Sequence, residues 1–268
     1  MRDYSKAGRI VIKVGTSTLT YESGHINIRR FEKLVKVLSD LANSGREIIL
    51  VSSGAMGVGM GKLGIKARPL ETPARQAIAA VGQLELMHQY DQAFLRFNRN
   101  TAQVLLTRDV VERPALRENA TNTLCELLSL GVVPIVNEND TVATDELEGE
   151  NFGDNDTLSA IVATLVEADI LILLSDIDGL YTQNPHDNPD AKLIPLVESV
   201  DGFIEQMASG SHSNRGTGGM ATKIHAAKTA AAAGIDMAII NGSDPALLYD
   251  LLEGKQVGTI FIGSGGSQ

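Results

Sequence analysis

The sequence predicts an α/β fold, a three-layer αβα sandwich around a central, mostly parallel sheet. Short apolar runs typical of strands alternate along the chain with segments whose apolar residues recur at helical spacing. The strand runs are continuously apolar, as expected where helices cover both faces of a parallel sheet. Small or polar residues follow almost every strand at once, which is where open parallel sheets bind their ligands.

The predicted strands are distributed along the whole chain. They are expected at residues 9–14, 47–51, 103–106, 132–136, 170–174, 237–240 and 259–262. Pro134 lies inside the fourth run. Because proline has no backbone N–H, it should lie where the ladder needs no donor.

Helices are predicted between these strands. They are expected near residues 31–41, 73–98, 116–130, 158–166, 220–233 and 247–252. The stretch 180–217 interrupts the alternation and is rich in Pro, Asn, Asp, Ser and Gly, so it should form loops or a small hairpin. With 268 residues and no internal repeat or low-complexity linker, the chain is expected to form a single domain.

Composition argues against several classes of protein. The net charge of −10 and the absence of a Lys/Arg run argue against a nucleic-acid binder, which needs a basic face. No apolar run approaches the roughly 20 residues of a membrane span, and residues 1–8 are too polar for a signal peptide. Cys125 is the one cysteine and lies in a helical pattern, so we expect a core thiol in a reducing cytoplasm. The five histidines are scattered without metal-ligand spacing.

A glycine-rich segment, residues 216–223, opens the predicted helix near residue 220. Three of the four residues from Gly216 to Gly219 are glycine, and Lys223 follows one turn into the helix. Free backbone N–H groups at a helix start can cradle a phosphate. The alternative is a flexible loop with a helix cap and a surface lysine, but this glycine density directly before a helix and a lysine favours the cradle.

Lys13 lies inside the first apolar strand run. Buried lysines are rare unless they are paired or functional. The alternative is an edge strand whose lysine reaches solvent. Its position near the strand end, beside Gly15 and Ser17, favours a contact with phosphate.

Other strand ends offer hydrogen-bonding groups. Ser53 follows the second strand but lacks the G-x-S-x-G context of a nucleophile, so we interpret it as a donor to substrate. Ser175 and Asp176 could contact a nucleotide ribose or base, although 176–179 could be only an Asp-Gly turn. Residues 59–64 match G-x-G-x-x-G without directly following a strand, so a dinucleotide fingerprint is rejected and the glycines from 54 to 64 are expected to pack close to a ligand.

Two acidic motifs, 137–140 and 153–156, lie between a predicted strand and a predicted helix and frame a polar loop. Carboxylates and carboxamides at this density suggest either a divalent metal or a ligand with a positive group. The residues alone leave both interpretations open.

Taken together, these motifs resemble the amino acid kinase family. The resemblance covers nearly the whole chain and is carried by residues 13–16, 51–55, 80–83, 105–108, 137–140, 153–156, 175–176, 179–182 and 216–223. The Asn-Glu-Asn-Asp and Gly-Asp-Asn-Asp pair is similar to the branch that phosphorylates the side-chain carboxylate of L-glutamate. The resemblance implies the amino acid kinase (carbamate kinase-like) fold, and ATP with Mg²⁺ as the phosphoryl donor for the first step of L-proline biosynthesis.

The resemblance also assigns roles to residues. It implies that Lys13 and Lys223 neutralise charge on the transferred phosphoryl group and that Asp156 holds these lysines. It implies ATP contacts from Lys13, Gly15, Ser175, Asp176, Thr217, Gly218, Gly219, Met220, Ala221, Thr222 and Lys223. It implies glutamate contacts from Ser53, Gly54, Asp140, Asp154 and Asn155. Mg²⁺ should arrive with ATP, so the acidic centre is interpreted as an acceptor site and no direct protein ligand of the metal is assigned.

Further expectations follow from the same resemblance. Residues 1–165 should form an acceptor lobe and residues 166–262 a nucleotide lobe, without the C-terminal PUA domain that many members of this branch carry. A homo-oligomer, feedback inhibition by proline involving residues 141–152, and transfer of the product to glutamyl phosphate reductase are also implied. The alternatives are an acetylglutamate or UMP kinase, or a non-catalytic sensor on this fold. An N-acyl substrate would leave Asp140 and Asp154 without an ammonium partner, UMP would need more basic groups, and a sensor would not need both lysines.

Overall fold

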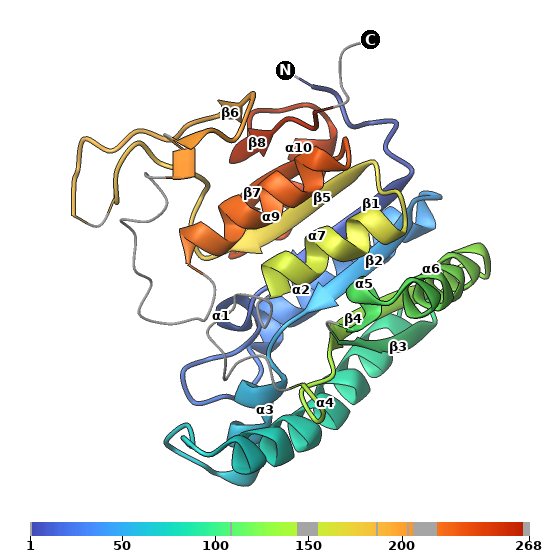
Figure 1. Cartoon of the computed structure of the whole chain (residues 1–268). Coiled ribbons are helices and arrows are strands. Elements are labelled where there is room, and N and C mark those ends of the chain that lie inside the picture. Colours follow the sequence, from blue (N-terminus) through green and yellow to red (C-terminus); the bar gives the residue numbers. More distant parts are fainter. Residues whose placement is uncertain are drawn as a thin grey trace.

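A computed structural model describes residues 2–107, 109–143, 155–185, 187–202, 204–205 and 219–264 (Figure 1). Within these residues the strands form one eight-stranded sheet in the order β3-β4-β2-β1-β5-β7-β8-β6. The strands are β1 (Arg9–Val14), β2 (Glu47–Ser52), β3 (Thr101–Leu106), β4 (Val133–Glu138), β5 (Ile170–Ser175), β6 (Leu196–Val197), β7 (Asp236–Asn241) and β8 (Thr259–Phe261).

The sheet is mostly parallel, as predicted. All strand pairs from β3 to β7 are parallel, whereas β8 runs antiparallel to β7, and β6 pairs parallel with β8. The carboxyl ends of β1, β2, β4, β5 and β7 therefore lie at one edge of the sheet. That arrangement gathers the polar segments that follow them.

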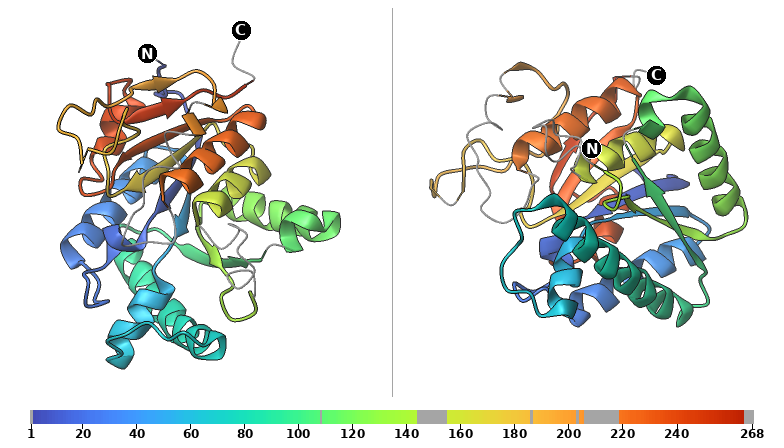
Figure 2. Two further views of the ribbon diagram at one scale, coloured as in Figure 1. Left: turned by 60° about the vertical axis from the view of Figure 1, so that its left-hand side comes forward. Right: turned by 60° about the horizontal axis from the view of Figure 1, so that its bottom comes forward.

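Helices cover both faces of the sheet, which confirms the three-layer prediction. One face packs against α2 (Ile28–Asn43), α4 (Thr72–Leu95) and α10 (Leu247–Leu252), and the other against α6 (Pro114–Ser129), α7 (Asn155–Leu165) and α9 (Met220–Ala232). Strand side chains alternate between these two cores: Ile10 and Ile12 enter the first, and Val11 the second. Both views of Figure 2 show α7 and α9 side by side on the sheet.

Three short helices that periodicity did not predict follow strand ends. They are α1 (Thr16–Leu19), α3 (Ala55–Leu63) and α5 (Asp109–Glu112). Four residues are too few to show a helical repeat, and α3 is rich in glycine. None of the described helices combines the length and apolar character needed to cross a bilayer.

Pro134 lies in the interior strand β4 without breaking its ladder. The amide of Val133 donates to Asn100 O on the β3 side, so the position of Pro134 faces β2. Pairing of β4 with β2 begins only at Leu50 and Ile135. The N–H group that proline lacks would therefore lie just before the first β2–β4 pair, where the ladder needs no donor.

The irregular stretch after β5 contains the small hairpin that the sequence suggested. Tyr181 and Leu193 form an antiparallel bridge, and the amide of Thr182 donates to Lys192 O at 2.9 Å. The two residues of β6 then join the edge of the sheet beside β8. Residues 206–218 lie outside the described part of the chain.

Glycines bring α3 and α4 into direct backbone contact. A Cβ on Gly59 would lie 2.1 Å from Ile78 O, and one on Gly61 would lie 2.8 Å from the carbonyl carbon of Gly24. A Cβ on Gly82 of α4 would lie 1.8 Å from Ala55 O. Gly59 and Gly61 therefore pack against protein backbone, and the idea that the glycines of this segment let loop and helix approach a ligand stays a prediction.

The Gly82→Ala variant is expected to lower the free energy of unfolding by about 1–3 kcal/mol or more, because its methyl group would overlap the backbone of α3. Gly57→Ala is the matched control. Its Cβ would lie 3.3 Å from the methyl group of Thr16, which can move, and alanine favours a helix over glycine. Urea unfolding measures both variants. Equal stability of the two would contradict this account of α3–α4 packing.

Candidate active site

The polar residues predicted from the strand ends converge at the carboxyl edge of the sheet. Lys13 comes from β1, Ser53 follows β2, Asn137 is the next-to-last residue of β4, Asn155 opens α7, and Lys223 lies in α9. Hydrogen bonds and ion pairs connect these residues into two adjoining groups. One is a buried charge cluster, and the other is a set of carboxamides.

The charge cluster is centred on Asp156. Lys13 Nζ lies 2.6 Å from Asp156 Oδ1, and Lys223 Nζ lies 3.0 Å from Asp156 Oδ2. Thr222 Oγ1 also donates to Asp156 Oδ2, at 3.1 Å. Asp156 is fully buried, and each lysine is 7% exposed. Two positive groups thus share one buried carboxylate at the carboxyl edge of the sheet.

The surroundings of the two lysines exclude the alternatives that the sequence left open. Lys13 lies opposite Val51 of β2 and Leu173 of β5, so its strand is central and not an edge strand. Lys223 is buried and not a surface lysine. Burying an ammonium group is costly unless it is paired, which Asp156 provides for both.

Asp156 remains ionised at any physiological pH. Burial raises the pKa of its carboxyl group, but the charges of Lys13 and Lys223 outweigh burial and lower the pKa to about 2. An acid with such a low pKa is a poor proton acceptor. Its chemistry here is to hold two cations in place.

This lowered pKa predicts a pH dependence of stability. The pKa of Asp156 falls from an ordinary 3.8 to about 2, so the unfolded chain binds the proton more tightly. The stabilisation, about 2 kcal/mol, is present above about pH 4 and lost as pH falls toward 2. Measured from pH 5 to 2, the free energy of unfolding should fall more for the wild type than for Asp156→Asn. Identical slopes would contradict the assignment.

The carboxamide group lies one residue away from Asp156. Asn155 Nδ2 donates to Ser53 Oγ at 2.8 Å and to Asn137 Oδ1 at 2.9 Å, and lies 3.3 Å from Ser52 O. Asn137 Nδ2 donates in turn to Gln83 Oε1 at 2.8 Å. Four segments far apart in the sequence are therefore joined through side-chain amides.

The structure brings together only some of the predicted substrate residues. Ser53 and Asn155 are in contact, and Gly54 starts α3 with a φ of 113°, a left-handed conformation that favours glycine. Asp140 lies half-buried just after β4. Asp154 lies outside the described residues. No group of three or more potential metal ligands among His, Cys, Asp and Glu occurs within the described ranges.

The predicted nucleotide residues lie around the same edge. Gly219 precedes the first residue of α9, Met220, and no side chain caps the first turn. Ser175 at the end of β5 is buried, its hydroxyl donates to Asp176 Oδ1 at 3.2 Å, and Asp176 is exposed. Gly15 starts α1 directly after β1. Thr217 and Gly218 lie outside the described residues, and Ala221 and Thr222 lie in the first turn of α9.

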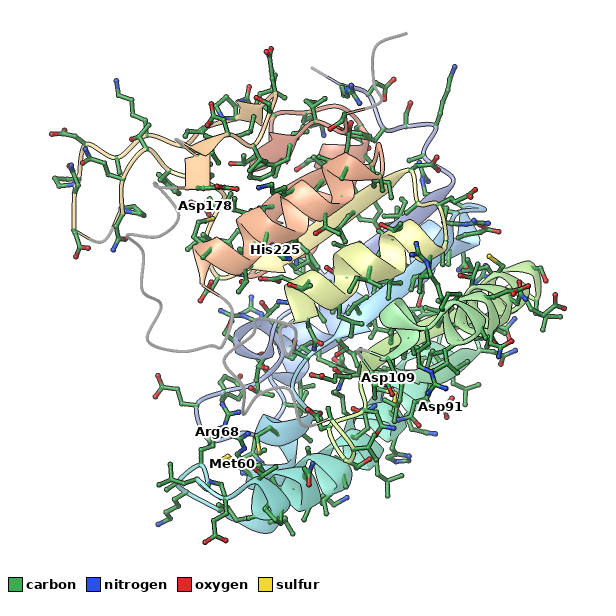
Figure 3. All side chains as sticks on the ribbon, in the orientation of Figure 1. Met60, Arg68, Asp91, Asp109, Asp178 and His225 are labelled. Atoms are coloured by element: carbon green, nitrogen blue, oxygen red, sulfur yellow. The ribbon has the colours of Figure 1, made fainter. Side chains whose placement is uncertain are left out.

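A further polar group, centred on Asp178, lies beside the nucleotide residues. Asp178, labelled with His225 of α9 in Figure 3, accepts hydrogen bonds from Asn241 Nδ2 at 2.7 Å and Tyr181 OH at 2.8 Å. These contacts connect the segment after β5 with the end of β7.

Two site residues received no role of their own from the sequence: Gln83 and Asn137. Gln83 occupies the buried stripe of α4 that includes Ala79, Leu86 and Tyr90. A carboxamide in an apolar helical stripe is a signal, because buried amides need hydrogen-bond partners. Its partner, 54 residues along the chain, could not be identified without the fold.

Comparisons with known proteins identify the family of the chain. The model of the amino acid kinase family matches residues 8–241. The chain is 53% identical over 259 residues to glutamate 5-kinase of Clostridium perfringens, covering 96% of each chain. It is 55% identical over 254 residues to glutamate 5-kinase of Listeria innocua, covering 94% of this chain and 92% of the relative. It is 51% identical over 261 residues to that of Enterococcus faecalis.

Solved structures with lower identity share the fold. UMP kinase from Bacillus anthracis aligns with a TM-score of 0.65 and 18% identity over 97% of both chains. Isopentenyl phosphate kinase of T. acidophilum aligns with a TM-score of 0.63 and 17% identity, over 94% of this chain and 99% of that one. At this identity the likeness establishes the architecture only.

Proposed function

Because this chain belongs to the amino acid kinase family, we propose from that premise that it is a glutamate 5-kinase. It transfers the γ-phosphoryl group of ATP to the side-chain carboxylate of L-glutamate and forms L-glutamyl 5-phosphate. The observation that carries this proposal is the pairing of Lys13 and Lys223 on Asp156, directly beside the acceptor amide of Asn155. Phosphate-neutralising and acceptor-binding groups thus adjoin each other.

The reaction needs no general base. A glutamate side chain has a pKa near 4.3, so the nucleophile is already ionised at neutral pH. The enzyme's task is to align donor and acceptor and to stabilise the charge of the transferred group. Lys13 and Lys223 supply positive charge from two different elements. Asp156, with its low pKa, keeps both ammonium groups in place without accepting a proton.

The proposed nucleotide site lies around the start of α9. Backbone N–H groups of residues 217–223 would bind phosphate oxygens, as the first turn of a helix favours anions. Gly15, Ser175 and Asp176 would contact the remaining parts of ATP. Residues 166–262 would then serve mainly the nucleotide, and residues 1–165 mainly the acceptor.

Mg²⁺ is proposed to arrive with ATP. Both oxygens of Asp156 are paired with lysines, so this carboxylate is already committed. Mg²⁺ usually binds to one or two carboxylates together with substrate phosphates, and when bound it neutralises charge on the β- and γ-phosphates.

The acceptor site is proposed to comprise Ser53, Gly54, Asp140, Asp154 and Asn155. Ser53 and Asn155 already form one hydrogen-bonded unit. The carboxylates of Asp140 and Asp154 would attract the ammonium group of a free amino acid. An N-acylated acid offers no such cation.

Hydroxylamine trapping tests the function. ATP, Mg²⁺, L-glutamate and hydroxylamine should give glutamyl hydroxamate, because hydroxylamine captures an acyl phosphate. Parallel reactions contain N-acetyl-L-glutamate, L-aspartate or UMP, with ADP release measured in each. Turnover of one of these without turnover of glutamate would refute the assignment. Binding of ATP and glutamate without any turnover would instead indicate a sensor.

The proposal also covers the location of the enzyme, the fate of its product, its inhibition and its assembly. The enzyme would act in the cytoplasm, pass its labile product to glutamyl phosphate reductase, and be inhibited by proline through residues 141–152, most of which lie outside the described chain. A homo-oligomer is also part of this proposal, and α4 carries two exposed leucines, Leu84 at 73% and Leu95 at 58%. Light scattering tests the assembly, and proline titration of the kinase assay tests inhibition.

A further inference from the structure

The chain of carboxamides from Asn155 through Asn137 to Gln83 has a defined direction. Each amide donates its N–H to the oxygen of the next, at 2.9 Å and then 2.8 Å. Asn137 is 3% exposed and Gln83 9% exposed, so solvent cannot easily replace either bond. A directional chain of this kind fixes which end of each amide faces which neighbour.

A backbone carbonyl sets the direction at the Asn155 end. Ser52 O lies 3.3 Å from Asn155 Nδ2 and can only accept a hydrogen bond. The reversed amide would place Asn155 Oδ1 against that carbonyl oxygen, which is repulsive. Asn137 must then present its oxygen to Asn155, and Gln83 must present its oxygen to Asn137.

The direction determines what the acceptor site offers to a ligand. Both N–H groups of Asn155 are used within the protein, so its Oδ1 is left as an acceptor, with no hydrogen bond from a described residue. Ser53 Oγ accepts from Asn155, so its own hydrogen is free to be donated. The site therefore presents one acceptor and one donor, which suits an ammonium group and a carboxylate.

We propose that Gln83 is a positioning residue that makes the acceptor site selective for a substrate with a free ammonium group. By holding the Asn137 oxygen toward Asn155, it reinforces the orientation that Ser52 O favours, with the carbonyl oxygen of Asn155 turned toward the acceptor. The inference rests on the proposed function, since it concerns the choice of acceptor by the same site. Gln83 does not contact the reacting atoms.

The placement of α4 supports this role. Gly82 lets α4 approach Ala55 at the start of α3, so that the neighbouring Gln83 reaches Asn137. The Nε2 group of Gln83 is buried and has no hydrogen-bond partner within the described part of the chain. A buried donor in that state disfavours glutamine on stability grounds alone. The hydrogen bond that Gln83 Oε1 accepts from Asn137 explains why this position carries an amide.

The test compares two acceptors that differ only in the amino group, L-glutamate and glutarate. The readout is the ratio of their kcat/KM values. Gln83→Met removes the oxygen that holds Asn137. Gln83→Asn shortens the side chain by one methylene, which moves the amide oxygen away from Asn137. Both are expected to reduce the ratio about tenfold or more, mainly through the KM for glutamate, with the KM for ATP unchanged. Gln83→Glu keeps an acceptor oxygen for Asn137 and should retain most of the preference.

The controls separate this inference from the function itself. Gln89→Met changes another glutamine of α4, one that donates to Glu85, and should leave the ratio unchanged. If Gln83→Met does not fold, Gln83→Asn supplies the measurement. An unchanged ratio in an active Gln83→Met or Gln83→Asn enzyme would overturn the role of Gln83 and leave the kinase assignment intact. Wild-type enzyme that phosphorylates neither acid would overturn both.

Discussion

The Lys223→Met variant is expected to lower kcat for glutamate phosphorylation by about 10²–10³-fold, the usual effect of removing one preorganised charge-stabilising group. Lys223 is buried in α9 and lies 3.0 Å from Asp156. Methionine keeps most of the side-chain volume but removes the charge. Since Asp156 remains paired with Lys13, the fold should be retained. Steady-state kinetics and a thermal melt measure the two effects separately.

Lys228→Met provides the matched control. It lies in the same helix but is mostly exposed and pairs with Glu205 at the surface. Its loss should change kcat little, because exposed ion pairs contribute little. A Lys223→Met enzyme with the activity of Lys228→Met would refute the role of Lys223 in phosphoryl transfer.

Asp156→Asn is expected to lower the free energy of unfolding by about 3–5 kcal/mol and kcat by at least about 10²-fold. The substitution removes the carboxylate that the buried ammonium groups of Lys13 and Lys223 share. Urea unfolding measures the stability, and the hydroxamate assay measures the activity. Asp244→Asn, which removes a half-exposed pair with Lys33, should cost at most about 1 kcal/mol.

A double variant tests whether Asp156→Asn loses stability through charge or through packing. Adding Lys223→Met to Asp156→Asn removes one of the two buried charges that have lost Asp156, so the double variant should regain part of the lost stability. Activity should stay low, because both changes affect the transferred group. A double variant less stable than Asp156→Asn would show that the loss comes from packing and not from charge.

Local patterns sufficed for most of the architecture. Continuous apolar strands and helical periodicity place the strands and longer helices close to where they occur, because each side chain's burial repeats along the chain. Lys13 was identifiable because a charge in such a run demands a partner. The antiparallel direction of β8 and the two-residue β6 were not predictable, since pairing at the sheet edge depends on distant segments.

The site, too, could be predicted only in part from the sequence. Glycines at 59, 61 and 82 are visible in the sequence, but only the fold reveals that their contacts are with backbone of α3, α4 and the turn at Gly24. Asp156 could be placed near the lysines by resemblance, whereas its contact with Thr222 depends on the first turn of α9. The link between Gln83 and Asn137 spans 54 residues and appears only when α4 packs beside β4.

The central claim, that the side-chain carboxylate of glutamate is the nucleophile, is tested most directly with L-glutamate carrying ¹⁸O in that carboxylate. The acyl phosphate product closes to the five-membered lactam when its amine attacks the side-chain carbonyl carbon. Phosphate then leaves with the oxygen that joined carbon to phosphorus. We expect inorganic phosphate that carries one ¹⁸O atom, detected by mass spectrometry. If the released phosphate contained no more ¹⁸O than the background, the γ-phosphoryl group would have gone to water or to another acceptor. That result would contradict the account.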